Sequence, residues 1–303
     1  MTPEYEAIWA AADSAAPPPL EIRYMLHAAA DALRAGGSPT PRLDADVLLA
    51  HVLHISRAQL YARLRDPWPV HALDAFGALL RRRLAGEPVA YLVGHKDFYG
   101  LDFHVDRRVL IPRPETEELV GAVLNALPGD AVGPVADLGT GSGAIAIALA
   151  RHRPHLRVYA CDISPDALAV AAANVAAHGL AGDPRFHLLA GDLGDPLPER
   201  VQGLVANLPY TVLDEVEPAV RTWEPTLALA GGGERGTGLI LRLLARAPGW
   251  LRPGGFLALE IGWDQAPLLL PAAAAAFPGA ELRVLHDLEH RDRILWVQTS
   301  AAC

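Results

Sequence analysis

Four short apolar stretches in the second half of the chain each end in residues that could bind a polar ligand. They are "PVADLG" before a glycine-rich turn, "RVYACD" ending at Asp162, "RFHLLAGD" ending at Asp192, and "GLVANLPY", in which Asn207 follows the apolar run. Apolar runs of this length are typical of buried strands. Ligands of open α/β proteins bind at the carboxyl edge of the sheet, so the pattern predicts one polar site built from four strand ends.

The glycine-rich turn lies in "DLGTGSGAIAIALA", with Gly139, Gly141 and Gly143 between the first strand and its helix. Glycines at this place let the backbone approach a ligand closely at the positive end of a helix. A dinucleotide-binding turn would read G-x-G-x-x-G, whereas this turn reads G-x-G-x-G and follows Asp137. The mismatch argues against a dinucleotide site. Tight packing of the turn against its helix is the alternative that involves no ligand.

The acids on the next two strands suit a nucleoside. Asp162 lies at the end of the second strand, where a carboxylate can accept hydrogen bonds from two ribose hydroxyls. Asp192, at the end of the third strand, is expected beside the base, and Leu193 could cover it.

The fourth strand stops at Asn207-Leu208-Pro209-Tyr210, although asparagine and proline are poor strand residues. One interpretation is a plain turn. The other is a rigid site that presents carbonyl acceptors beside an aromatic face.

The elements around these residues alternate strand and helix after Pro134, which predicts a doubly wound, mostly parallel α/β sheet. The last two strands, "ELRVLHD" and "RILWVQT", are close enough in sequence to pair antiparallel. We expect a loosely ordered lead over residues 1–20, a small helical domain over 21–90, a β-hairpin linker over 91–112 around Tyr99-Gly100, and the α/β domain over 113–303. "IPRPETEELV" predicts a helix that starts at Pro114 with acid in its first turn.

The composition excludes several classes of protein. The 303 residues carry a formal net charge of −9, which disfavours a surface that coats nucleic acid. The two cysteines, Cys161 and Cys303, have no zinc-ligand spacing and indicate a reducing compartment. The N-terminus has no cationic lead before an apolar run, and the apolar runs are too short for a membrane span. We therefore expect a cytoplasmic protein.

Taken together, the chain resembles the class I S-adenosylmethionine-dependent methyltransferases, and among them the HemK-type protein glutamine methyltransferases. The resemblance covers nearly all of the chain after residue 20. The stretches that carry it are "RRRLAGEPVAYLVGHKDFYGLDFHVDRRVLIPRPETEELV", "DLGTGSGAIAIALA", "DISPDALAVAAANVAAHG", "WEPTLALAGG", "GGFLALEIG" and "HRDRILWV".

The resemblance implies a methyltransferase fold and assigns residues to two binding functions. S-adenosylmethionine, which leaves as S-adenosylhomocysteine, would be held by Asp137, Gly139, Thr140, Gly141, Ser142, Gly143, Asp162, Asp192, Leu193 and Asn207. The substrate pocket and catalytic residues would be Asn207, Leu208, Pro209 and Tyr210, with Phe98 of the hairpin closing the pocket or serving only as hairpin core. The family usually has Asn-Pro-Pro-Tyr, so Leu208 is a departure. Adenine dimethyltransferases of ribosomal RNA often carry Asn-Leu-Pro-Tyr, but they lack the "IPRPETEELV" region.

The chemistry of an amide nitrogen explains the strand end. Its lone pair is delocalised, so acceptors aimed at its two hydrogens can orient it and stabilise the charge that develops during methyl transfer. The Asn207 side-chain oxygen and the Leu208 carbonyl would be those acceptors, and no metal is expected because the sulfonium already activates the methyl group. The implied substrate is the Gly-Gly-Gln loop of peptide chain release factors. The alternatives are a ribosomal protein, an adenine amine in RNA or DNA, or a cofactor-binding interaction module without catalysis.

Overall fold

The computed structural model describes residues 20–301, in two compact units that divide between Val93 and Gly94. Nearly all of the lead expected over residues 1–20 lies outside the described residues, and so does Cys303. No helix within the described range is both long and apolar enough to cross a membrane.

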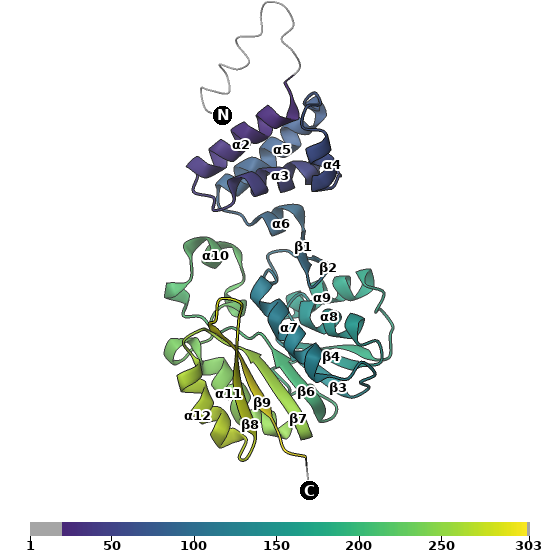
Figure 1. Cartoon of the computed structure of the whole chain (residues 1–303), viewed down its shortest axis with the longest axis vertical. Coiled ribbons are helices and arrows are strands. Elements are labelled where there is room, and N and C mark those ends of the chain that lie inside the picture. Colours follow the sequence, from purple (N-terminus) through teal and green to yellow (C-terminus); the bar gives the residue numbers. More distant parts are fainter. Residues whose placement is uncertain (1–19, 302–303) are drawn as a thin grey trace, which may run out of the picture. The chain divides into compact units, whose positions relative to one another are not determined.

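The first unit is helical, and its helices begin where the sequence provides caps (Figure 1). Pro41 occupies the first turn of its helix, and the Ser56 side chain accepts a hydrogen bond from the Gln59 amide in a capping box. Apolar residues from all of the α-helices form one core. Its elements are α2 (Ile22–Ala35), α3 (Pro41–Val52), α4 (Arg57–Ala62), the short 3₁₀ helix Val70–Ala72, α5 (Leu73–Leu84) and α6 (Val89–Val93).

The second unit begins with the predicted hairpin, β1 (His95–Phe98) and β2 (Leu101–His104), which pair antiparallel. Seven further strands of the described chain form one sheet in the order β5-β4-β3-β6-β7-β9-β8. They are β3 (Pro134–Leu138), β4 (Arg157–Asp162), β5 (Phe186–Ala190), β6 (Val201–Ala206), β7 (Leu251–Glu260), β8 (Glu281–His286) and β9 (Asp292–Gln298). The first five of these are parallel, and β9 runs antiparallel to both of its neighbours. The predicted fold class is therefore confirmed.

Helices lie on both faces of this sheet, as a doubly wound arrangement requires (Figure 1). One group packs near β3, β4 and β5, and α11 packs on α12 beside β8 and β9. The helices are α7 (Pro114–Ala126), α8 (Ala144–His152), α9 (Pro165–Ala177), α10 (Pro218–Trp223), α11 (Gly238–Arg246) and α12 (Ala266–Ala276). The stretch "GLILRLLARAPGWL" predicts one long helix, whereas α11 ends at Arg246 and a 3₁₀ turn follows. Pro248 explains the stop, because a proline has no amide hydrogen with which to continue the α-helical hydrogen bonds.

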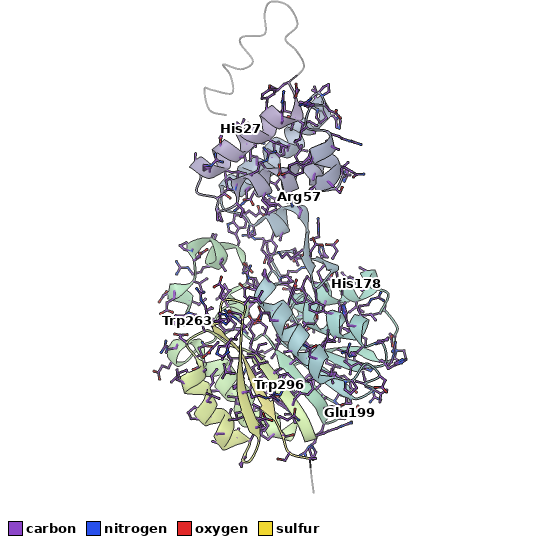
Figure 2. The ribbon with its side chains drawn as sticks, in the orientation of Figure 1. His27, Arg57, His178, Glu199, Trp263 and Trp296 are labelled. Atoms are coloured by element: carbon purple, nitrogen blue, oxygen red, sulfur yellow. The ribbon has the colours of Figure 1, made fainter. Side chains whose placement is uncertain are left out.

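Asn174 on α9 joins the hairpin to the glycine-rich turn. Its side-chain oxygen accepts from the His104 amide at 2.8 Å, and its nitrogen donates to the His104 carbonyl at 2.9 Å and the Ser142 carbonyl at 2.8 Å. The residue is fully buried, so removal of its amide would leave these backbone groups without the hydrogen-bond partner that it supplies. His178, near the end of the same helix, adds a contact to the Asp102 carbonyl at 2.9 Å (Figure 2).

We expect Asn174→Ala to lower the free energy of unfolding by about 2–4 kcal/mol, because it leaves buried backbone groups of β2 and of the turn without partners. Urea unfolding of the purified variant measures this change. Asn125→Ala, at an exposed position on α7, is the matched control and should change stability little. Equal stability of the two variants would contradict the role assigned to Asn174.

Candidate functional site

Two adjoining cavities open at the carboxyl ends of the parallel strands. The first has a volume of about 400 Å³ and lies along the glycine-rich turn, Asp162, Asp192 and the hairpin. The second, of about 420 Å³, lies between the Asn207–Tyr210 segment and the residues that follow β7. Asn207, Leu208 and Pro209 line both cavities. The segment that ends β6 is therefore the wall between two spaces, each large enough for a small molecule or a side chain.

The glycine-rich turn needs glycine for conformation and for space. Gly139, Gly141 and Gly143 have φ of +75°, +56° and +83°, a region that other residues rarely adopt. A Cβ atom at Gly139 would lie 3.0 Å from Cδ2 of Leu208, which packs over the turn. The amides of Gly139 and Thr140 both donate to the Cys161 carbonyl at 2.9 Å, so the turn is tied to β4.

Asp137 supports this turn from below. One carboxylate oxygen accepts from the Thr140 hydroxyl at 2.6 Å and from the Ala146 amide at 3.2 Å, and the other has no hydrogen-bond partner among the described residues. Burial raises the pKa of Asp137 to about 7. The residues that line either cavity include neither Asp137 nor Gly143. These two hold the turn in place, whereas Gly139, Thr140, Gly141 and Ser142 line the first cavity.

Asp162 lines the first cavity at the end of β4. Its two oxygens accept from the Gly141 amide at 2.8 Å and from the Ser164 amide at 2.9 Å. Burial raises the pKa of this carboxyl group, while these backbone hydrogen bonds lower it. Each carboxylate oxygen has capacity for a further bond, so the group can accept from two hydroxyls of a ligand.

Asp192 and Leu193 lie across the same cavity. Leu193 is 5% exposed and has a φ of +51°, so its backbone is held in a left-handed conformation that is sterically costly for a residue with a side chain. The Asp192 carboxylate is paired with the Arg242 guanidinium through two contacts of 2.9 Å. Arg242, which also lines the cavity, is a partner that the sequence pattern did not reveal.

Asn207 is held by a chain of buried and partly buried hydrogen bonds at the boundary of the two cavities. Its Nδ2 atom donates to the Thr116 hydroxyl at 2.9 Å, and that hydroxyl donates to the Glu260 carboxylate at 2.7 Å. The Tyr210 hydroxyl donates to the other oxygen of Glu260 at 3.1 Å. Thr116 lies in the first turn of α7 and Glu260 ends β7, so three elements meet at this point. Burial raises the pKa of the Tyr210 hydroxyl, which keeps it a donor at neutral pH.

The backbone of Pro209 and Tyr210 is enclosed by a glycine-rich loop. Cβ atoms at Gly231 and Gly236 would lie 2.8 Å from the Pro209 carbonyl oxygen and 2.2 Å from that of Tyr210. Gln265 also donates to the Tyr210 carbonyl at 2.8 Å. The segment is therefore rigid, as a site that presents fixed acceptors requires.

The hairpin and the start of α7 close the edge of the site. Phe98 is 1% exposed and lines the first cavity, so it is both hairpin core and cavity wall. Arg113 lines both cavities and donates to buried Glu224. Glu117 accepts from the Tyr99 amide at 2.9 Å and so fixes the hairpin turn. Trp263, 64% exposed, lines the second cavity (Figure 2).

The structure brings together the predicted site residues other than Asp137 and Gly143, and it adds Arg242, Thr116 and Glu260. Glu260 had a signal in the sequence, because it is a polar residue at the end of "GGFLALEIG" and obeys the same strand-end rule as Asp162 and Asn207. Thr116 had no such signal in the sequence, where it stands between Glu115 and Glu117. No group of three or more histidine, cysteine or acidic side chains within residues 20–301 could hold a metal ion.

Comparisons with known proteins identify the family. Residues 25–94 match the PrmC N-terminal domain and residues 120–223 match the methyltransferase small domain. A release factor glutamine methyltransferase of Moorella thermoacetica is 45% identical over 278 residues, which cover 90% of this chain and 97% of the relative. One of Cereibacter sphaeroides is 44% identical, with 91% and 98% covered.

A solved methyltransferase structure from Pyrococcus furiosus is similar in fold, with a TM-score of 0.51, 17% identity, and 73% of this chain and 97% of that chain covered. The sequence relatives carry the assignment, because their identity and coverage are high over nearly the whole chain. The chain belongs to the release factor glutamine methyltransferase family.

Proposed function

We propose that the protein transfers a methyl group from S-adenosylmethionine to the side-chain amide nitrogen of a glutamine in a peptide chain release factor, most directly the glutamine of its Gly-Gly-Gln loop. The observation that carries this proposal is the position of Asn207, a rigid amide between two adjoining cavities. The first cavity suits the nucleoside and the second suits a planar side chain.

The residues that line the first cavity suit S-adenosylmethionine. Asp162 offers acceptors for the two ribose hydroxyls, and Leu193 offers an apolar surface for adenine. The left-handed glycines leave the turn without side chains where the backbone faces the cavity. The Asp192 carboxylate is already paired with Arg242, so in this proposal the pair acts on the base together. S-adenosylmethionine supplies, when bound, a methyl group that its sulfonium already activates.

The chain's own residues then orient the acceptor nitrogen. Asn207 directs its side-chain oxygen, and Leu208 its main-chain carbonyl, at the two hydrogens of the glutamine amide. Both acceptors stabilise the positive charge that develops on the nitrogen, and neither has to move to do so. Tyr210 provides a flat wall in the second cavity, and its hydroxyl is held by Glu260. Leu208 can replace the proline of related motifs because a backbone carbonyl is available from either residue.

The remaining parts of the proposal concern partner and place. The helical residues 21–90 would recognise the release factor, and residues 91–112 would join them to the methyltransferase domain at 113–303. The net charge of −9 supports a protein substrate over naked nucleic acid. Release factors act in translation, so we infer a cytoplasmic location.

The substrate is tested with labelled S-adenosylmethionine and four acceptors: a release factor, the same factor with its loop glutamine changed to alanine, ribosomal proteins, and ribosomal RNA. We expect label in the intact release factor and none in the alanine variant. Faster labelling of a ribosomal protein would redirect the proposal to that substrate, and labelling of RNA at a comparable rate would overturn it.

The cofactor site is tested with Asp162→Ala, which should weaken S-adenosylmethionine binding by roughly 1.5–3 kcal/mol because the ribose hydroxyls lose a charged acceptor. Titration calorimetry measures the affinity. Asp162→Asn keeps one acceptor oxygen and should lose less, and thermal unfolding shows whether either variant has disturbed the turn. Unchanged affinity in folded Asp162→Ala removes this residue from the site.

The acceptor role is tested with Asn207→Ala, which should lower the single-turnover rate on the order of 10²–10³-fold, as removal of one preorganised polar contact does. Cofactor affinity should change far less, because the turn and Asp162 remain. Asn207→Asp keeps an acceptor and should retain more activity than alanine. An intact transfer rate in Asn207→Ala would mean that the asparagine is only a turn residue.

A further inference from the structure

We propose that Thr116 and Glu260 are positioning residues that decide which end of the Asn207 side-chain amide faces the substrate. The inference rests on the proposed function, in which the Asn207 oxygen is an acceptor for the glutamine amide. It assigns a role to two residues that the chemistry of the strand-end motif does not itself include.

The argument starts from the single proton of the Thr116 hydroxyl. That hydroxyl lies 2.7 Å from Oε2 of Glu260 and 2.9 Å from Nδ2 of Asn207. A carboxylate only accepts, so the hydroxyl spends its one proton on Glu260. The Thr116 oxygen therefore presents only lone pairs to Asn207, so it can accept a hydrogen bond from the amide nitrogen but cannot donate one to the amide oxygen. The nitrogen of the amide is therefore fixed on Thr116, and the oxygen must point the other way.

The second oxygen of Glu260 is also occupied by a donor. The Tyr210 hydroxyl donates to it at 3.1 Å, and the residue as a whole is 1% exposed. Burial raises the pKa of Glu260, whereas the hydrogen bonds from Thr116 and Tyr210 and the charge of Arg293 lower it, with Glu115 acting in the opposite direction. Two hydroxyl donors directed at one carboxyl group suit its ionised form, since a protonated carboxyl would have to donate to one of them.

A reversed amide would oppose the reaction. With Nδ2 toward the substrate, a donor would face the hydrogens of the glutamine amide, and the charge that develops on the substrate nitrogen would meet a positive edge. An asparagine alone cannot avoid this, because its two ends have nearly the same shape. The Glu260–Thr116 pair breaks that symmetry through hydrogen-bond direction.

A merely structural role for the pair is the competing explanation. Thr116 and Glu260 link α7 to β7, and such a link could serve stability alone. The two roles differ in what they change. A structural link affects unfolding, whereas amide orientation affects the methyl-transfer step after both substrates have bound.

The experiment measures single-turnover methyl transfer to a release factor, with S-adenosylmethionine and the factor both saturating. Thr116→Val keeps the shape and removes the hydroxyl, and it should lower the rate on the order of 10–100-fold, less than loss of the Asn207 acceptor itself. Cofactor affinity should stay within about twofold, since Asp162 and the glycine-rich turn are unchanged in this variant. Thr116→Ser keeps the hydroxyl and should restore most of the rate.

A double-mutant cycle then separates the two roles. Glu260→Gln should slow transfer in the wild-type background. The glutamine side chain has one acceptor oxygen, whereas the hydroxyls of Thr116 and Tyr210 each donate to a separate oxygen of Glu260. The substitution should slow transfer little further in Thr116→Val or in Asn207→Ala, where the link to the acceptor is already broken. Tyr210→Phe removes the donor to the other oxygen of Glu260 but leaves the contact between Thr116 and Asn207 in place, so it should slow transfer less than Thr116→Val does.

Three results decide the matter. Additive effects of Glu260→Gln and Thr116→Val, or a wild-type rate in folded Thr116→Val, overturn the orienting role while leaving the proposed function intact. A wild-type rate in Asn207→Ala overturns the acceptor mechanism, and this inference with it. If Thr116→Val fails to fold, the cycle of Glu260→Gln with Asn207→Ala decides alone: additivity rejects the inference and non-additivity supports it.

Discussion

A carboxylate buried at the end of a strand persists only where other elements supply donors to it. Glu260 is such a group, and its donors come from the first turn of α7 and from the segment after β6. These contacts fix α7, β6 and β7 against one another at the point where Asn207 leaves the sheet. The two cavities meet at the same point, so the geometry of the proposed methyl transfer depends on the hydrogen bonds that the Glu260 carboxylate accepts.

A second constraint is the close approach of backbone to backbone around the Asn207–Tyr210 segment. Leu208 lies over Gly139 on one side, and the loop from Gly231 to Gly236 lies against the carbonyls of Pro209 and Tyr210 on the other. The Leu208 side chain is 3% exposed and is used in packing, while its carbonyl is the atom proposed to face the substrate. Under the proposed function, this separation would let leucine take the place of the proline of related motifs, because the substrate would contact only the carbonyl.

Much of the architecture could be predicted because local signals agree with the fold. The helix start predicted at Pro114 is confirmed, the Ser56 and Ser164 side chains cap their helices, and the alternation around Tyr99-Gly100 gives the hairpin. The strand-end rule located Asp162 and Asn207 because parallel strands bring their carboxyl ends to one edge. The same rule applied to the next strand would have found Glu260.

What the sequence did not reveal depends on contacts between distant segments. Thr116 lies 91 positions before Asn207 and 144 before Glu260, and nothing in its local pattern marks it. The pairing of Asp192 with Arg242 joins residues 50 positions apart on different elements. The resemblance assigned Asp137 to the cofactor, and in the structure its carboxylate is fully buried and accepts a hydrogen bond from the Thr140 hydroxyl. A local sequence pattern gives neither the distant partners of Thr116 and Asp192 nor the depth at which Asp137 is buried.

The most direct measurement is a crystal structure of the protein with S-adenosylhomocysteine and a peptide that carries the release factor glutamine. The glutamine side-chain nitrogen should lie within hydrogen-bond distance of both the Asn207 side-chain oxygen and the Leu208 carbonyl, with Asn207 Nδ2 still on Thr116. A glutamine bound elsewhere, or one whose carbonyl oxygen rather than its nitrogen faces Asn207, would contradict the central claim.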